Sequence, residues 1–259
     1  MKKSIKILAI GNSFSVDGME YLWQVLRAGG VEQVILGNLA IGGCPVSLHA
    51  DNVASDAPAY LYGKNTAGTW VWESEQTFSR GLLDEEWDII TLQQASHDSG
   101  LSETYARQGE VIDYVNTHKR NPNALLYWHM TWAYQSDSDH WAFPRYDCDQ
   151  ATMYHAILNA VQTQVLPNPA YAGVIPSGIA IQNLRATPVG DTVTRDGFHM
   201  SESHGRYTAA LTWARTLCGV NPDNVDWMPE AFDDAIRPDL GYIREAVKAA
   251  GIMPLSDDF

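Results

Sequence analysis

The stretch Ile5-Lys6-Ile7-Leu8-Ala9-Ile10 runs directly into Gly11-Asn12-Ser13-Phe14-Ser15, and this junction decides the fold class. A short apolar run rich in isoleucine is typical of a strand that is buried on both faces. The run stops at Gly11, which makes it too short for the apolar core of a signal peptide. It therefore predicts a buried first strand over residues 6–10, with Ser13 just beyond its carboxyl end and before a helix.

Similar apolar runs alternate with helical patterns along the chain, which predicts a parallel sheet covered by helices on both faces. No internal repeat or interdomain linker interrupts the pattern, so we expect a single domain over residues 1–259. The expected strands lie at residues 33–39, 88–92 and 124–130, with the start of another at 173–175, and the expected helices at 19–28, 103–118, 149–165, 202–218 and 240–250.

Two long stretches do not fit the alternation. Residues 44–80 and 131–148 are rich in aromatic and polar side chains, and both begin after predicted strands. Loops at the carboxyl ends of parallel strands build the ligand crevice in sheets of this kind, so we expect both to be functional loops. Residues 221–259 carry four prolines and are expected to form a peripheral segment with one helix.

Charge excludes several classes of partner. The chain of 259 residues has 31 acidic and 17 basic side chains, a net charge of −14. Such a balance disfavours nucleic acid and anionic membrane surfaces, and no apolar run reaches the roughly 20 residues that span a bilayer. Three widely spaced cysteines indicate a reducing compartment rather than disulfides or a metal site. We expect a cytoplasmic protein, unless a signal peptide has been removed.

A serine, a histidine and an aspartate are candidates for a hydrolytic triad. A serine hydroxyl needs a neutral imidazole to take its proton and an acid to orient that imidazole. In Asp196-Gly197-Phe198-His199 the carboxylate can reach one ring nitrogen on a tight turn, which leaves the other free for Ser13. Two alternatives stay open at this point. Ser13 or Ser15 can simply cap a helix, and an Asp-x-x-His string is common by chance.

Other polar groups follow the predicted strands and could stabilise an oxyanion. Gly42-Gly43 follows the second strand, where a backbone N–H can approach a ligand closely, although a plain turn explains these glycines equally well. Gln93 and Gln94 end the third strand, where their amides can donate to an oxyanion or to loop backbone. His97 and Asp98 form a further acid–histidine pair, which ranks below Asp196 and His199.

The blocks Gly11-Asn12-Ser13-Phe14-Ser15, Gly43, Gln94 and Asp196-Gly197-Phe198-His199 resemble those of the SGNH hydrolase (GDSL-like esterase) superfamily. The resemblance runs from residue 6 to about residue 218. Two further runs, residues 92–100 and 130–135, look like the DUF4886 branch of that superfamily.

This resemblance implies a fold, an activity and roles for residues. The implied fold is a flavodoxin-like three-layer α/β/α sandwich with a central parallel five-stranded sheet, and the activity is ester hydrolysis without a cofactor or metal. Ser13 would be the nucleophile, His199 the base and Asp196 its orienting acid, with the Ser13 and Gly43 N–H groups in the oxyanion hole. The superfamily usually adds an asparagine from a Gly-x-Asn-Asp block, which is missing here. Gln94 is the expected substitute, with Gln93 or His97 as the other choices.

The sequence favours a serine esterase that acts on a small acyl ester, above all an O-acetyl group on a carbohydrate. Aromatic faces suit sugar rings, so we expect substrate contacts from the two long loops, although the same aromatics can equally pack those loops onto the domain. The expected contacts are Trp70, Trp72, Trp132 and Tyr134, with Gln93 and His97.

Two other classes of function compete with the esterase. One is a catalytically silent carbohydrate-binding protein on an esterase fold, because fold alone does not determine activity. The other is a metal-dependent phosphoesterase that uses His97, Asp98, His140 and Asp147, although these histidines lack the spacing of familiar metal motifs. The sequence indicates no oligomeric state.

Overall fold

A seven-stranded mixed sheet forms the centre of the protein, in the order β4-β3-β2-β1-β5-β6-β7. The computed structural model describes residues 3–251. Five adjacent strands run parallel, and β3 and β4 extend the β2 edge as an antiparallel hairpin. The strands are β1 (Ser4–Gly11), β2 (Gln33–Ala40), β3 (Tyr60–Asn65), β4 (Trp70–Gln76), β5 (Ile89–Leu92), β6 (Leu125–His129) and β7 (Tyr171–Ile175).

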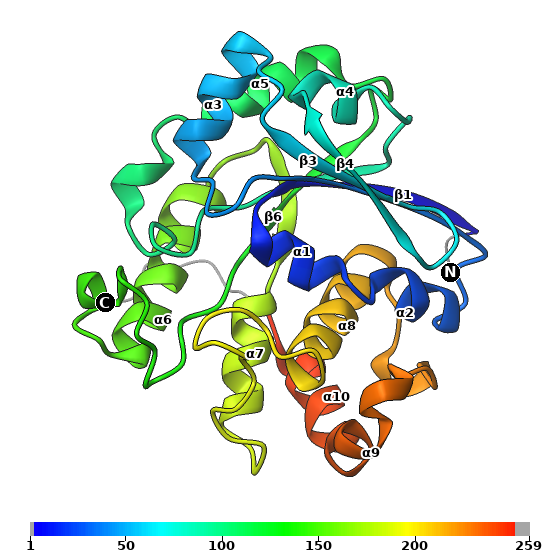
Figure 1. Ribbon diagram of the computed structural model, residues 1–259, viewed down its shortest axis with the longest axis vertical. Helices are drawn as coiled ribbons and strands as arrows, with labels where there is room; N and C mark the ends of the chain where they lie inside the picture. Colours follow the sequence, from blue (N-terminus) through cyan, green and yellow to red (C-terminus); the bar gives the residue numbers. More distant parts are fainter. Residues whose placement is uncertain (1–2, 252–259) are drawn as a thin grey trace.

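Helices cover both faces of this sheet (Figure 1). Helices α1, α2, α7, α8 and α10 pack together on one face, while α3, α4 and α5 lie on the other. The helices are α1 (Ser13–Met19), α2 (Leu22–Ala28), α3 (Val46–Ser55), α4 (Phe78–Leu82), α5 (Gln108–His118), α6 (Gln150–Ala160), α7 (Ser177–Arg185), α8 (His204–Cys218), α9 (Asp233–Ile236) and α10 (Leu240–Ala249). None of these helices combines the length and apolar character that a transmembrane span requires.

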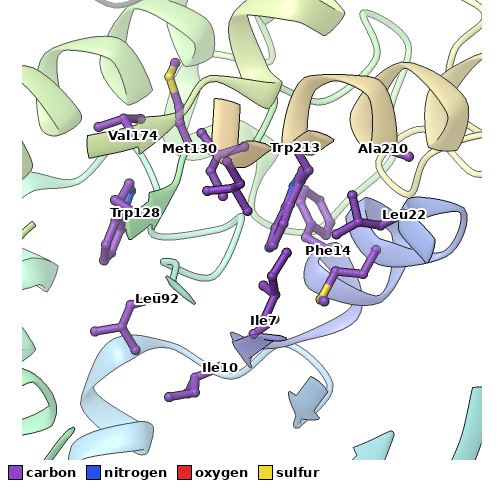
Figure 2. Packing of buried hydrophobic residues seen from close by; sticks show 14 of the residues in the cluster. Ile7, Ile10, Phe14, Leu22, Leu92, Trp128, Met130, Val174, Ala210 and Trp213 are labelled. Carbon is purple, nitrogen blue, oxygen red and sulfur yellow. The ribbon is translucent and has the colours of Figure 1, made fainter. Parts of the chain in front are cut away.

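The first strand explains why the core forms on both faces of the sheet. Ile7, Leu8, Ala9 and Ile10 of β1 are all completely buried, as expected for a central parallel strand. Figure 2 shows Trp213 of α8 beside the ring of Phe14 and above Ile7. The helix that follows β1 is thereby held against the sheet through its second residue, immediately after Ser13.

The prediction that residues 44–80 form a long loop is wrong. This stretch contains α3, the β3–β4 hairpin and the start of α4, so the expected sheet of five parallel strands is two strands too small. Tyr60 and Tyr62 are buried, and Trp72 packs directly on Gly63, where a Cβ atom would come within 2.5 Å of the ring. The aromatic residues therefore build an edge hairpin, which aromatic side chains favour.

The second predicted loop, residues 131–148, does lack α-helix and strand, and its one regular segment is a 3-10 turn at Phe143–Tyr146. In the C-terminal segment, as far as residue 251, α10 packs against α7 and α8. The rest of that segment, residues 252–259, lies outside the described residues.

One charge cluster anchors the hairpin to the segment after α4. The carboxylate of Asp84 accepts hydrogen bonds from Tyr62 at 2.9 Å and Lys64 at 2.6 Å, and it also pairs with Arg80. Burial raises the pKa of Asp84, but these three partners lower it more strongly, to about 2. The ionised carboxylate is therefore stabilised in the folded protein.

Asp84→Asn should destabilise the protein at neutral pH but not in acid. Because the pKa of Asp84 is lower in the folded chain, its contribution is complete above about pH 4 and is lost as the pH falls towards about 2. We expect the variant to lose about 2 kcal/mol of unfolding free energy at neutral pH. Urea unfolding of the wild type and of Asp84→Asn across this pH range measures the difference in unfolding free energy. A difference that stays constant with pH would contradict the lowered pKa of Asp84.

Candidate active site

Ser13 is the first residue of α1, and Asn12 is the residue that caps this helix. Asn12 has an extended backbone, with φ −144° and ψ −157°, and its side-chain oxygen accepts the Phe14 backbone N–H at 2.9 Å. The hydroxyl of Ser15 instead lies 2.7 Å from the Asn12 carbonyl oxygen. Neither serine therefore serves as the cap, and the Ser13 hydroxyl is free for another partner.

Ser13, His199 and Asp196 form a continuous line of hydrogen bonds. Asp196 Oδ2 lies 2.6 Å from His199 Nδ1, and His199 Nε2 lies 2.8 Å from Ser13 Oγ. Burial raises the pKa of Asp196, but hydrogen bonds from the His199 side chain and backbone outweigh this, so the pKa lies below its ordinary value. An ionised carboxylate only accepts hydrogen bonds, so His199 carries its proton on Nδ1 and presents Nε2 as an acceptor to the Ser13 hydroxyl.

A tight loop holds Asp196 and His199 in this arrangement. The second oxygen of Asp196 accepts the His199 backbone N–H at 2.7 Å, which closes a turn between the two residues. Gly197 has φ +86°, and a Cβ there would come within 2.9 Å of Ser138. The turn therefore requires glycine both for its backbone conformation and for its close approach to the 131–148 segment.

Asp17, one turn after Ser13 on α1, fastens this loop to the helix. Its carboxylate is completely buried. Its Oδ1 accepts from Arg195 at 2.9 Å and from Arg206 at 2.8 Å, and its Oδ2 accepts the Met200 backbone N–H at 2.8 Å. Arg195 and Met200 flank the Asp196–His199 turn on its two sides. One buried carboxylate thus fixes the position of the histidine loop relative to the helix that begins with Ser13.

A cavity of about 470 Å³ opens over Ser13 and His199. Gly43 lies on its wall with φ +63°, and a Cβ added there would meet no atom within 4 Å. Within residues 3–251, the backbone N–H groups of Ser13 and Gly43 have no protein acceptor. The full lining is Asn12, Ser13, Phe14, Gly42, Gly43, Ser96, His97, His140, Trp141, Phe198 and His199.

The expected oxyanion role of Gln94 is not supported. Its side chain is buried away from the cavity lining, and its amide nitrogen donates to Thr104, at 3.1 Å to the carbonyl and 3.0 Å to the hydroxyl. Its oxygen accepts the Val46 backbone N–H at 2.9 Å. Both the nitrogen and the oxygen of the amide are therefore bonded within the protein, and Gln94 ties the start of α3 to the loop after β5.

Gln93 also lies outside the cavity lining, contrary to its expected contact with substrate. It is 2% exposed, and its amide joins Asn12 to His129. Among the residues that the sequence predicted to contact substrate, His97 is the one that does line the cavity.

The four aromatic residues expected to contact substrate do not line the cavity. Trp70 and Trp72 stack on each other on β4 with ring centroids 5.4 Å apart. Trp132 is completely buried, stacks on Phe14 at 4.4 Å and donates to the Phe198 carbonyl at 2.7 Å. Tyr134 is also completely buried, with its hydroxyl 2.9 Å from Ser96 Oγ. Trp132 and Tyr134 therefore support cavity-lining residues from the interior of the protein.

Other residues of the 131–148 segment take the place of those aromatics. Trp141 is 66% exposed and lies at the cavity with His140, and the Arg145 guanidinium sits 5.2 Å from the Trp141 ring centroid. The sequence did mark this segment, but it offered no signal that Trp141 points outward while Trp132 points inward. Asn12, Phe14, Ser96 and Phe198 were likewise not predicted as lining residues.

The residues of the metal hypothesis do not form a metal site. Asp98 pairs with Arg145 at 2.8 Å, and Asp147 caps the 3-10 turn with φ +58°. His97 and His140 line the cavity, but no group of three or more metal-ligating side chains occurs among the residues that the structure describes.

Comparisons with known proteins place the chain in a family. The model of a family described as "Domain of unknown function (DUF4886)" matches residues 6–237. A crystal structure of a DUF4886 family protein from Bacteroides uniformis is 37% identical, with a TM-score of 0.89 over 97% of this chain and 98% of that one. A gut microbial diltiazem-metabolizing enzyme shares 14% identity, with a TM-score of 0.51 over 83% of this chain and 47% of that one, which shows a similar fold alone. No curated protein matches the sequence. Because the family model spans most of the residues, the chain belongs to the DUF4886 family.

Proposed function

We propose that this protein is a serine esterase that hydrolyses small acyl esters, with Ser13 as nucleophile, His199 as base and Asp196 as the group that orients it. The observation that carries the proposal is the line of hydrogen bonds from Asp196 through His199 to Ser13, at 2.6 and 2.8 Å, beside an open cavity. This arrangement meets the geometric requirement for an activated serine, as the resemblance to SGNH hydrolases also implies.

In the first half of the reaction, Ser13 Oγ attacks the acyl carbon of the ester while His199 Nε2 takes the hydroxyl proton. The negative oxygen of the tetrahedral intermediate is held by the backbone N–H groups of Ser13 and Gly43, which have no other acceptor in the described protein. When the intermediate collapses, the bond to the alcohol breaks and His199 returns the proton to the departing oxygen. Ser13 is left acylated.

In the second half, a water molecule attacks the acyl-enzyme and gives a proton to the same nitrogen of His199. Collapse of the second intermediate releases the carboxylic acid and returns the proton to Ser13. Asp196 keeps the imidazole in the Nδ1–H tautomer throughout and stabilises the imidazolium that forms in both halves.

The substrate that fits best is an O-acetyl group on a carbohydrate. A cavity of about 470 Å³ suits a small ligand, and the small Gly42–Gly43 wall next to Ser13 leaves room for a compact acyl group. Trp141 supplies an exposed ring at the rim, where an aromatic face can pack against a sugar. The aromatic contact is thus assigned to Trp141 instead of the buried or distant aromatics.

Trp141→Ala should raise KM for an acetylated sugar about fivefold, since loss of one aromatic contact is worth about 1 kcal/mol. Hydrolysis of p-nitrophenyl acetate should stay near the wild-type rate, because this small ester does not need the rim. Trp72→Ala is the matched control, as it removes a tryptophan that does not line the cavity. Equal KM values for wild type and Trp141→Ala on a panel of acetylated sugars would remove this role.

Covalent labelling by a fluorophosphonate tests the proposed function directly. Mass spectrometry should locate the label on Ser13, and the labelled protein should no longer hydrolyse p-nitrophenyl acetate. A protein that neither labels nor hydrolyses esters would instead support the alternative of a binding protein on an esterase fold.

A further inference from the structure

A chain of hydrogen bonds crosses the sheet at the carboxyl ends of its five parallel strands. One member, His129, ends β6, and the others follow β7, β5, β1 and β2; the five strands are neighbours in the order β7, β6, β5, β1 and β2. The Ser177 hydroxyl lies 3.0 Å from His129 Nε2, and His129 Nδ1 lies 3.0 Å from Gln93 Oε1. The Gln93 amide nitrogen then lies 2.7 Å from Asn12 Oδ1, and the Asn12 amide nitrogen lies 3.2 Å from the Cys44 carbonyl oxygen.

The donor and acceptor in each of these hydrogen bonds can be assigned from the Phe14 backbone N–H, which bonds to Asn12. The Phe14 backbone N–H can only donate, so the Asn12 atom facing it is the oxygen, and Gln93 must present its nitrogen to that same oxygen. The Gln93 oxygen therefore accepts from His129 Nδ1–H, and Ser177 donates to the other ring nitrogen. Burial lowers the pKa of His129 to about 3, so the ring stays neutral and keeps this single tautomer.

This chain of hydrogen bonds is buried away from water and is closely packed by neighbouring residues. Each of its five residues is at most 2% exposed. A Cβ on Gly11 would come within 2.7 Å of Gln93, and the His129 ring packs edge-on against Trp213 at 4.8 Å. Unpaired polar groups are costly in such surroundings, so the members hold one another in one arrangement.

The last member of the chain connects it to the candidate site. Asn12 immediately precedes Ser13 and caps the helix that Ser13 begins. Its amide nitrogen also holds the carbonyl of Cys44, the residue after Gly43. Asn12 therefore bridges the two backbone segments whose N–H groups are the oxyanion donors of the proposed mechanism.

We infer that Gln93 and His129 are positioning residues for the oxyanion hole: acting through Asn12, they set the distance between the Ser13 and Gly43 N–H groups. Neither side chain lines the cavity, so neither contacts the substrate. The inference rests on the proposed function. It predicts an effect on the transition state, where the oxyanion exists, and little effect on the bound ester.

Gln93→Met tests this inference, with Gln94→Met as its matched control. Both variants remove the amide of a buried glutamine, but Gln94 is bonded to Thr104 and Val46 instead of Asn12. We expect Gln93→Met to lower kcat for p-nitrophenyl acetate on the order of 10- to 100-fold, with KM changed less than about twofold. Gln94→Met should keep near wild-type kcat despite a similar loss of melting temperature. Rates are normalised to the fraction of protein that a fluorophosphonate can label.

Inhibition by a simple alkyl boronic acid separates positioning from general loss of structure. A boronate bound to Ser13 imitates the tetrahedral intermediate, so its Ki should rise in Gln93→Met by the same factor as kcat falls. Ki does not depend on the fraction of folded enzyme. If Gln93→Met does not fold, Asn12→Ser replaces it, because serine can still cap α1 but reaches neither Gln93 nor Cys44.

Each outcome decides a different claim. Matching changes in Ki and kcat in Gln93→Met or Asn12→Ser, and not in Gln94→Met, support the inference. Unchanged kcat and Ki in a folded variant, or equal changes in the Gln94→Met control, overturn the inference and leave the esterase intact. Wild-type protein without hydrolysis that depends on Ser13 overturns the proposed function, and the inference with it.

Discussion

Replacing Ser13 with alanine should lower kcat/KM for p-nitrophenyl acetate by about 10⁴-fold or more. The Ser13 hydroxyl lies 2.8 Å from the nitrogen that would accept its proton, and no other hydroxyl within residues 3–251 is hydrogen-bonded to His199. Without this nucleophile only binding and the oxyanion donors remain, which leaves a small residual catalysis of attack by water. Initial rates of purified wild type and Ser13→Ala, measured side by side, give the ratio.

Ser15→Ala is the control for this experiment. Ser15 lies two residues further along the same helix, but it is buried and bonded to Asn12 and Asn38 instead of His199. Its loss should cost about 1 kcal/mol of stability and leave the rate within a few-fold of wild type. Equal activity of wild type and Ser13→Ala would show that another group performs the hydrolysis, and the proposed function would fall. A large loss in both variants would point to damage to α1 instead.

The sequence predicted the parts of the fold that depend on local patterns. The apolar runs located all five parallel strands to within a few residues, because strands buried on both faces need continuous apolar sequence. The hairpin of β3 and β4 was missed, since these strands lie at the edge of the sheet and lack the continuous apolar sequence that marks the buried parallel strands. The helix expected at residues 19–28 corresponds to α2, whereas the separate short helix α1 was not predicted, because the polar residues Ser13, Ser15 and Asp17 hide its helical pattern.

The same contrast holds for the candidate site. Asp196 and His199 are three residues apart on one turn, so their contact was predictable from spacing, and the structure brings both to Ser13. The orientation of Gln94 and Trp132 was not predictable. Each follows the carboxyl end of a strand, as ligand-binding residues do, but Thr104 and Phe198 hold them on the inner side. Such side-chain orientations depend on contacts with residues distant in the sequence, and the sequence alone does not reveal these contacts.

Asp17→Asn should lower the free energy of unfolding by about 3 kcal/mol or more, since removing one partner of a buried ion pair leaves the other charges uncompensated. The Asp17 carboxylate is completely buried and accepts from both Arg195 and Arg206. Asparagine has nearly the same shape, so the loss reports the charge and not a cavity. Urea unfolding at neutral pH measures the difference.

The same variant should slow the reaction of Ser13 with a fluorophosphonate about 10- to 100-fold, at a temperature where the protein is still folded. The reason is geometric: Arg195 and the Met200 backbone N–H, both held by Asp17, lie on either side of the turn that carries His199. Asp84→Asn is the matched control, because it removes a carboxylate bonded to two cations and lies outside the cavity lining. It should lose stability but label at the wild-type rate. If Asp17→Asn also labels at that rate, the 194–200 loop holds His199 in place without Asp17, whose role would then be confined to stability.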